Sequence, residues 1–167
     1  TDATEQANLS TPDPLHSSRV RPDGQKVSWD IISILNPALP FLRSPYAPLI
    51  PPAPDAPRHA NGAQGIARLQ LESSDPAALV ELYAKLLGTT PPAGTQEHGA
   101  ATVFRVGSGV LYIVERKPDS PAANPSRVES RPLRSVTLKA PPGTTARTLD
   151  VTPTHGANIR LVATDST

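Results

Sequence analysis

The sequence predicts an α+β fold, with a mixed or mostly antiparallel sheet and one well-defined helix. Residues 66–71 alternate between apolar and polar side chains, which is typical of a strand with one buried face. A helix is predicted over residues 75–88, because apolar side chains recur there at the helical spacing i, i+3, i+4 and i+7. This apolar stripe consists of Leu79, Leu82, Tyr83 and Leu86.

Both ends of the predicted helix carry the appropriate signals. Ser74 or Asp75 can cap the first turn, and Pro76 suits the first helical position. Gly88 follows the last apolar residue of the stripe and can adopt the left-handed conformation that ends many helices. The N-terminal cap, the apolar stripe and the C-terminal cap therefore all predict the same helix.

Further strands are predicted on the C-terminal side of the helix. Residues 101–106 and 110–115 are separated by a short glycine-containing loop, which predicts a hairpin. Residues 135–140 and 157–163 are predicted to be two more strands. The segment 62–167 would thus form one folded module.

The N-terminal part has a different composition, rich in proline. Of the 21 prolines in the chain of 167 residues, many lie before residue 58. We expect a disordered tail over 1–18, and then a hairpin and proline-rich arm over 19–61. The turn signal Pro22-Asp23-Gly24 marks the hairpin.

Composition narrows the possible functions. The absence of cysteine excludes disulfides and thiolate metal sites. A net charge of +1 without a long basic run argues against a nucleic-acid partner. No apolar run reaches the ~20 residues that span a bilayer. No charged-then-apolar N-terminal signal is visible, so no membrane partner and a cytoplasmic location are expected.

Several short motifs together resemble the glyoxalase-like domain of the vicinal oxygen chelate superfamily. The most recognisable is the run from Asp75-Pro76 through Tyr83 to Leu87-Gly88. It is flanked by the strand 65–71 and by the segments 104–107 and 111–115. Further similarity is found upstream and downstream, so that the resemblance covers about 19–164.

The resemblance implies a single βαβββ module, where the family normally pairs two modules into a cup. The missing companion would precede Thr1, and the chain does not start with methionine. A lone module leaves sheet edges and apolar surface uncovered. We therefore expect association with a second copy or with an N-terminal module.

The resemblance also places the candidate site. In metal-dependent relatives the first and last strands of each module supply ligands, and these positions fall on Arg68 and near Glu115. Arginine has no lone pair to donate, so no metal and no cofactor are expected. Arg68 can instead bind an anion or pair with an acid such as Glu115. His59 and Tyr112 complete the substrate-binding candidates, and no catalytic residue is identified.

Three functional hypotheses remain open, and the sequence does not decide whether the chain is an enzyme. The first is a glyoxalase-like protein that binds a small molecule in a sheet-lined cup, including the case of a degenerate or incomplete enzyme. The second is a non-catalytic interaction module that pairs through its open sheet. The third is a metal-dependent lyase or dioxygenase whose ligands come from the missing module.

Overall fold

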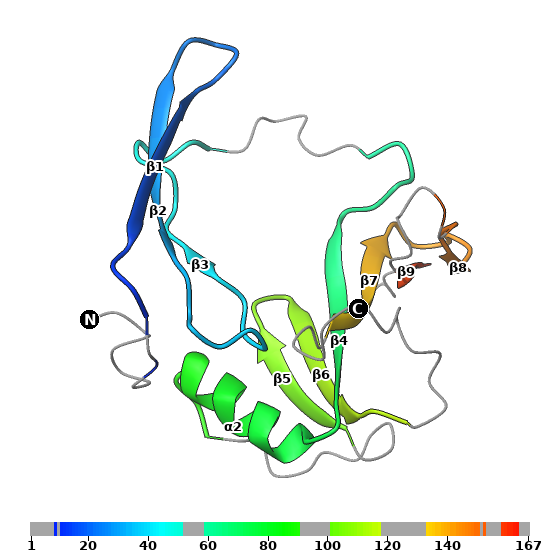
Figure 1. Ribbon diagram of the computed structural model, residues 1–167. Helices are drawn as coiled ribbons and strands as arrows, with labels where there is room; N and C mark the ends of the chain where they lie inside the picture. The colour runs from blue at the N-terminus through cyan, green and yellow to red at the C-terminus, as the bar shows by residue number, and fades with distance from the viewer. Residues whose placement is uncertain are drawn as a thin grey trace. The chain divides into compact units, whose positions relative to one another are not determined.

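The structure is a computed structural model, and it describes residues 9, 11–51, 59–90, 101–117, 133–150, 152 and 158–163. The chain divides into two compact units. The first contains Thr1–Pro54 with Glu81–Thr90, and the second contains Asp55–Val80 with Pro91–Thr167. The described residues form the helix α2 and two sheets, which confirms the predicted α+β class (Figure 1).

The first unit contains a three-stranded antiparallel sheet. Its order is β1 (Leu15–Val20), β2 (Lys26–Ile32) and β3 (Leu42–Arg43). β1 begins inside the segment 1–18 that we predicted to be disordered. Its polar sequence shows no strand pattern, but pairing with β2 from Leu15↔Ile31 to Val20↔Lys26 satisfies its backbone.

The predicted turn joins β1 to β2. Gly24 has a φ of 82°, a conformation that glycine adopts without steric cost. Its N–H donates to the Arg21 carbonyl at 2.9 Å, and the Gln25 N–H donates to the Asp23 carboxylate at 3.0 Å. The Pro-Asp-Gly turn is therefore confirmed in its predicted place.

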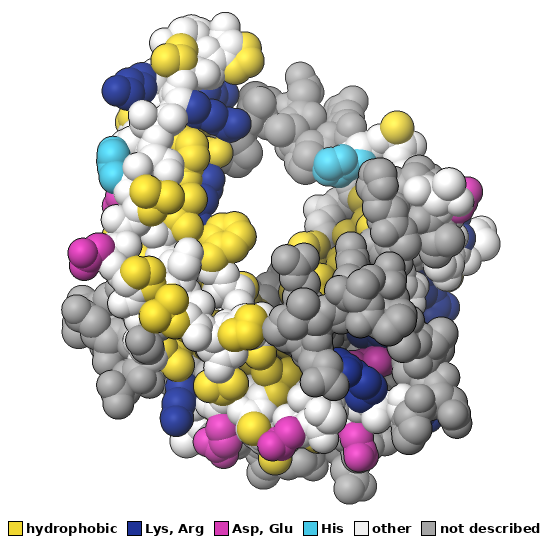
Figure 2. Space-filling view, in the orientation of Figure 1, with side chains coloured by type: hydrophobic (Ala, Val, Ile, Leu, Met, Phe, Trp, Pro, Cys, Tyr) yellow, Lys and Arg dark blue, Asp and Glu magenta, His cyan; other side chains and the backbone are white. Residues whose placement is uncertain are grey.

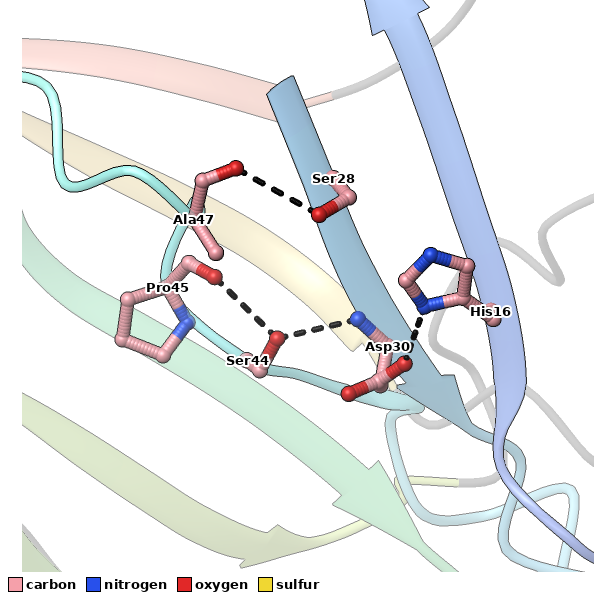
Figure 3. Close-up of polar contacts among 6 residues, drawn as sticks. All are labelled: His16, Ser28, Asp30, Ser44, Pro45 and Ala47. Carbon is pink, nitrogen blue, oxygen red and sulfur yellow. Dashed lines mark hydrogen bonds and ion pairs between the residues drawn. The ribbon is translucent and has the colours of Figure 1, made fainter. Parts of the chain in front are cut away.

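The start of the proline-rich stretch is hydrogen-bonded to β2 (Figure 3). Ser44 accepts from the Asp30 N–H through its Oγ at 2.9 Å and donates to the Pro45 carbonyl at 3.1 Å. Ala47 and Ser28 exchange two backbone hydrogen bonds, of 2.8 and 3.0 Å. This part of the predicted proline-rich arm is therefore hydrogen-bonded to the sheet.

Two arginines and two aromatic rings pack together beside these contacts. The Trp29 and Tyr46 rings meet edge to face, with 5.4 Å between their centroids. The guanidinium of Arg43 lies 4.2 Å from the Tyr46 centroid, and Arg19 donates to the Tyr46 hydroxyl at 3.1 Å. Hydrogen bonding to Arg43 lowers the pKa of Tyr46, burial opposes this, and the positive charge of Arg19 also lowers it. The cluster joins β1, β2 and the segment after β3.

The helix α2 spans Pro76–Leu86, close to the predicted range. Asp75 caps it, because its carboxylate accepts from the Ala78 N–H at 3.0 Å. At the other end Gly88 has a φ of 62°, and Thr89 N–H donates to the Ala84 carbonyl at 3.0 Å. This geometry is the Schellman motif, and it confirms both predicted caps.

The apolar stripe of α2 differs from the prediction at one position. Leu79, Tyr83 and Leu86 are buried as expected, but Leu82 is only half-buried. Val80 and Ala84 are buried in its place. The buried stripe is thus shifted around the helix axis, which the spacing of large side chains alone does not reveal.

The second unit contains a six-stranded sheet in the order β5-β6-β4-β7-β9-β8. β4 lies parallel to β6 and β7 lies parallel to β9, while the other neighbours are antiparallel. The order β4–α2–β5–β6–β7 along the chain is the βαβββ order. The strands are β4 (Gly65–Ser73), β5 (Thr102–Val106), β6 (Gly109–Glu115), β7 (Leu133–Ala140), β8 (Arg147–Thr148) and β9 (Asn158–Ala163).

The two faces of this sheet differ in burial. Residues directly opposite one another in neighbouring strands point to the same face. The register therefore shows on which face of the sheet each side chain lies. One face carries all the buried strand residues, which are Leu71, Phe104, Leu111, Ile113, Ala140 and Leu161. The other face, here called the open face, carries Arg68, Gln70 and Glu72 of β4 and the residues in register with them. None of these is buried.

Among the described residues, no helix has both the length and the apolar character required to cross a membrane.

Candidate functional site

Three arginines lie in one row across the open face. Arg68 on β4 is opposite Val110 of β6, and Val110 is also opposite Arg105 of β5. On the other side Arg68 is opposite Thr137 of β7, which is opposite Arg160 of β9. Arginines therefore occupy every second strand of the row. Because neighbouring strands are about 4.8 Å apart, successive arginine backbones are about 10 Å apart.

The central arginine is held against an aromatic ring. The guanidinium carbon of Arg68 lies 4.5 Å from the centroid of the Tyr112 ring, which is cation–π geometry. Tyr112 is opposite Gln70, two residue pairs further along β4 and β6 and therefore on the same face. This contact orients the planar fork of Arg68 and leaves its N–H donors available for an anion. Two predicted site residues, Arg68 and Tyr112, are thus brought together.

Two further described cations of the open face, Arg134 and Lys139, have partners. Arg134 lies at the register shift in β7, and its Nε is 3.5 Å from the Glu72 carboxylate. Lys139 donates to the Ser108 carbonyl at 3.1 Å and to its hydroxyl at 2.8 Å. In the described part of the chain, Arg68, Arg105 and Arg160 take part in no ion pair. Among the described residues of this face, the three arginines of the row therefore have no carboxylate partner.

The structure does not bring Glu115 to Arg68. Glu115 is opposite Ser73 at the far end of β4, five residue pairs from the Arg68↔Val110 pair. At about 3.3 Å per residue the two backbones are about 17 Å apart, and alternation places the side chains on opposite faces. Glu115 is exposed. The ion pair between Arg68 and Glu115, one alternative from the sequence, is therefore wrong.

Neither of the two described histidines, His16 and His59, lies in the strands that form the row. His59 is exposed in the loop before β4, where its carbonyl accepts from the Gly62 N–H at 2.8 Å. His16 belongs to the other unit, and its Nδ1 is 2.9 Å from the Asp30 carboxylate (Figure 3). His98 and His155 lie outside the described residues.

The described residues do not contain a metal-binding cluster. Among them, no three side chains of the types His, Cys, Asp or Glu are grouped so as to hold a metal ion. The strand position that the resemblance assigns to a ligand is Arg68, whose guanidinium cannot donate a lone pair. The guanidinium groups of the row can instead donate hydrogen bonds to an anion.

Sequence reasoning did not align Arg105 and Arg160 with Arg68. Alternation along each strand places them on the polar side of β5 and β9, which the sequence does reveal. Their alignment with Arg68 depends on which strands are neighbours and in which register. No signal within a single strand carries that information.

The arrangement of strands and helix agrees with a family match. The model of the glyoxalase-like domain family matches residues 1–87, which include the three-stranded sheet, β4 and α2. The chain belongs to this family. The match also takes in the segment 1–61, which we predicted to be a tail and an arm.

A solved structure has a similar fold. It is the crystal structure of a hypothetical protein from Staphylococcus aureus, with a TM-score of 0.64 and 15% sequence identity. The similarity covers 96% of this chain and 60% of that chain. At this identity the similarity concerns the fold alone. No curated protein matches the chain.

Proposed function

We propose that this glyoxalase-like chain binds a small anionic molecule on the open face, with Arg68 as the principal ligand-binding residue. The observation that carries the proposal is the contact between Arg68 and Tyr112, at 4.5 Å, in the middle of the arginine row. A guanidinium held over a ring has fewer orientations open to it, and its N–H donors can still bind an anion. Carboxylate and phosphate groups accept two parallel hydrogen bonds from the edge of a guanidinium.

The half-buried position of Arg68 strengthens the expected interaction. Its neighbours Val110 and Tyr112 are also half-buried, so a bound anion would lose part of its contact with water. Electrostatic attraction and hydrogen bonding both become stronger as the local dielectric falls. An exposed arginine without such neighbours would bind the same anion weakly.

Titration with pentanoate and with butyl phosphate, followed by amide NMR, tests this proposal. Binding should shift the amides of β4 and β6 around Arg68. Arg68→Gln should weaken binding about 10–100-fold, since a hydrogen bond to a charged group contributes about 1.5–3 kcal/mol. The preferred probe identifies the anionic group.

A matched control separates a specific site from general electrostatics. Arg147 is an exposed arginine of the same sheet, and its register opposite Leu161 places it on the buried face. Arg147→Gln changes the net charge by the same amount as Arg68→Gln and should leave binding unchanged. An equal loss in both variants would overturn the proposal.

A second candidate function is association between two copies of the chain. β1 is an edge strand in the first unit, and β5 is an edge strand of the six-stranded sheet. β1 exposes Leu15 and Val20, at 64% and 67% of their surface. Figure 2 shows hydrophobic side chains gathered along this part of the molecule. Unpaired edges with apolar side chains favour strand pairing between molecules.

Analytical ultracentrifugation across the micromolar to hundred-micromolar range measures this association. We expect a monomer–dimer equilibrium that Leu15→Lys combined with Val20→Lys shifts towards the monomer, because lysines on an edge strand disfavour pairing. A 17.6 kDa monomer at every concentration would exclude this candidate. The anion-binding proposal does not depend on the result.

A further inference from the structure

The spacing of the arginines in the row bears on the shape of the ligand as well as on its charge. Arg68 and Arg105 flank Val110 on the same row of the open face, and neither is in an ion pair among the described residues. Their backbones are about 10 Å apart, two strand spacings. Two flexible arginine side chains at this separation can hold both ends of one elongated molecule.

The surface between these two arginines is apolar. Val110 lies between them in the row, and the adjacent row contributes Val103 and Tyr112, which are opposite one another. All three side chains are half-buried, so they are partly accessible from the open face. A hydrocarbon segment placed over them would leave water, which favours binding.

The opposite direction along the row has a different surface. Between Arg68 and Arg160 lies Thr137, and the adjacent row contributes Ser135, opposite Asn158. These polar side chains offer less apolar area to a hydrocarbon segment than Val103, Val110 and Tyr112. The Arg68 guanidinium also contacts a ring on β6, on the side towards Arg105. Both observations select Arg105 rather than Arg160.

We infer that the ligand is an elongated molecule with an anionic group at each end and an apolar segment between them. One anionic group binds Arg68, the other binds Arg105, and the apolar segment lies over Val110. This inference rests on the proposed function, since it assigns the second end of a ligand whose first end is held by Arg68.

Linear α,ω-dicarboxylates of increasing length, from malonate to dodecanedioate, test the inference against monocarboxylates of the same length. Calorimetric titration at constant ionic strength removes differences in screening. Dicarboxylates of intermediate length should bind at least tenfold more tightly than the matched monocarboxylates. Two equivalent ends alone would give only a twofold statistical gain. Malonate, which has no apolar segment long enough to cover Val110, should show no gain.

Two variants identify the second arginine. Arg105→Gln should reduce the advantage of the dicarboxylate over the matched monocarboxylate to no more than twofold. Arg160→Gln is the matched control, because Arg160 lies at the same distance from Arg68 in the row, and it should keep the advantage. Loss of the advantage in Arg160→Gln instead of Arg105→Gln would overturn the inference.

The outcomes separate this inference from the proposed function. If monocarboxylates bind through Arg68 and dicarboxylates bind no more than twofold better, only the two-ended ligand is excluded. If neither class shifts the amides around Arg68 and phosphate esters also fail, the proposed function falls and the inference falls with it. A length-dependent gain that requires both Arg68 and Arg105 supports both.

Discussion

Replacing Ile113 by alanine should lower the free energy of unfolding by about 2–5 kcal/mol. Ile113 is 1% exposed and lies in β6 opposite Leu71, which is 3% exposed. Removing its side chain beyond Cβ loses the transfer free energy of the buried groups and leaves a cavity that the neighbouring strands fill only in part. For a domain whose total stability is about 5–15 kcal/mol, this is a large fraction.

Urea denaturation followed by circular dichroism measures the change, and the next residue supplies its control. Val114 is half-buried and lies on the open face, opposite Glu72. Val114→Ala should cost well under half of the Ile113→Ala loss, because its side chain is already partly hydrated. Similar losses for the two variants would contradict the assignment of the two faces.

The sequence is most informative where local signals decide the structure. Asp75, Pro76 and Gly88 bracket α2, and the observed caps use Asp75 and Gly88 as predicted. The turn around Gly24 is equally local, because its conformation depends on the residue itself. Boundaries of this kind are set within a few residues, so they can be read without knowing the tertiary fold.

Features that depend on pairing were not predictable. β3 and β8 contain two residues each, too few to show a periodic pattern. β1 is polar and is a strand only because β2 lies beside it. Its sequence therefore resembles an irregular tail.

In the candidate site, too, some features could be predicted from the sequence and others depend on strand pairing. Arg68 and Tyr112 could be selected from the resemblance, and the structure places them in contact. Glu115 was selected in the same way and lies elsewhere, because the parallel register of β4 and β6 sets it opposite Ser73. The arginine row needs four pairings between five strands. Each arginine was visible in the sequence, whereas their alignment was not.

Stability at alkaline pH should depend on Tyr83. This side chain is 8% exposed, and its hydroxyl donates to the Ala38 carbonyl at 3.4 Å. Burial raises the pKa of Tyr83 from 10.0 to about 12, because the charged phenolate is disfavoured away from water. Below pH 10 the hydroxyl is protonated in both folded and unfolded chains, and its contribution is fully present.

Above pH 10 the unfolded chain loses this proton first. The unfolded state is then stabilised relative to the folded state, so stability falls as the pH rises from about 10 through about 12. A difference of about two pKa units at 1.36 kcal/mol each corresponds to a loss of about 2–3 kcal/mol. Urea denaturation at a series of pH values between these limits measures the loss.

Tyr83→Phe removes the titrating hydroxyl and keeps the buried ring. Lysines and the other two tyrosines ionise in both proteins, so the difference between the wild type and the variant isolates Tyr83. We expect the gap in stability between them to change by about 2–3 kcal/mol across this range, in favour of the variant. A gap that stays constant with pH would mean that the phenolate of Tyr83 reaches water in the folded chain, and the burial of this face of α2 would have to be revised.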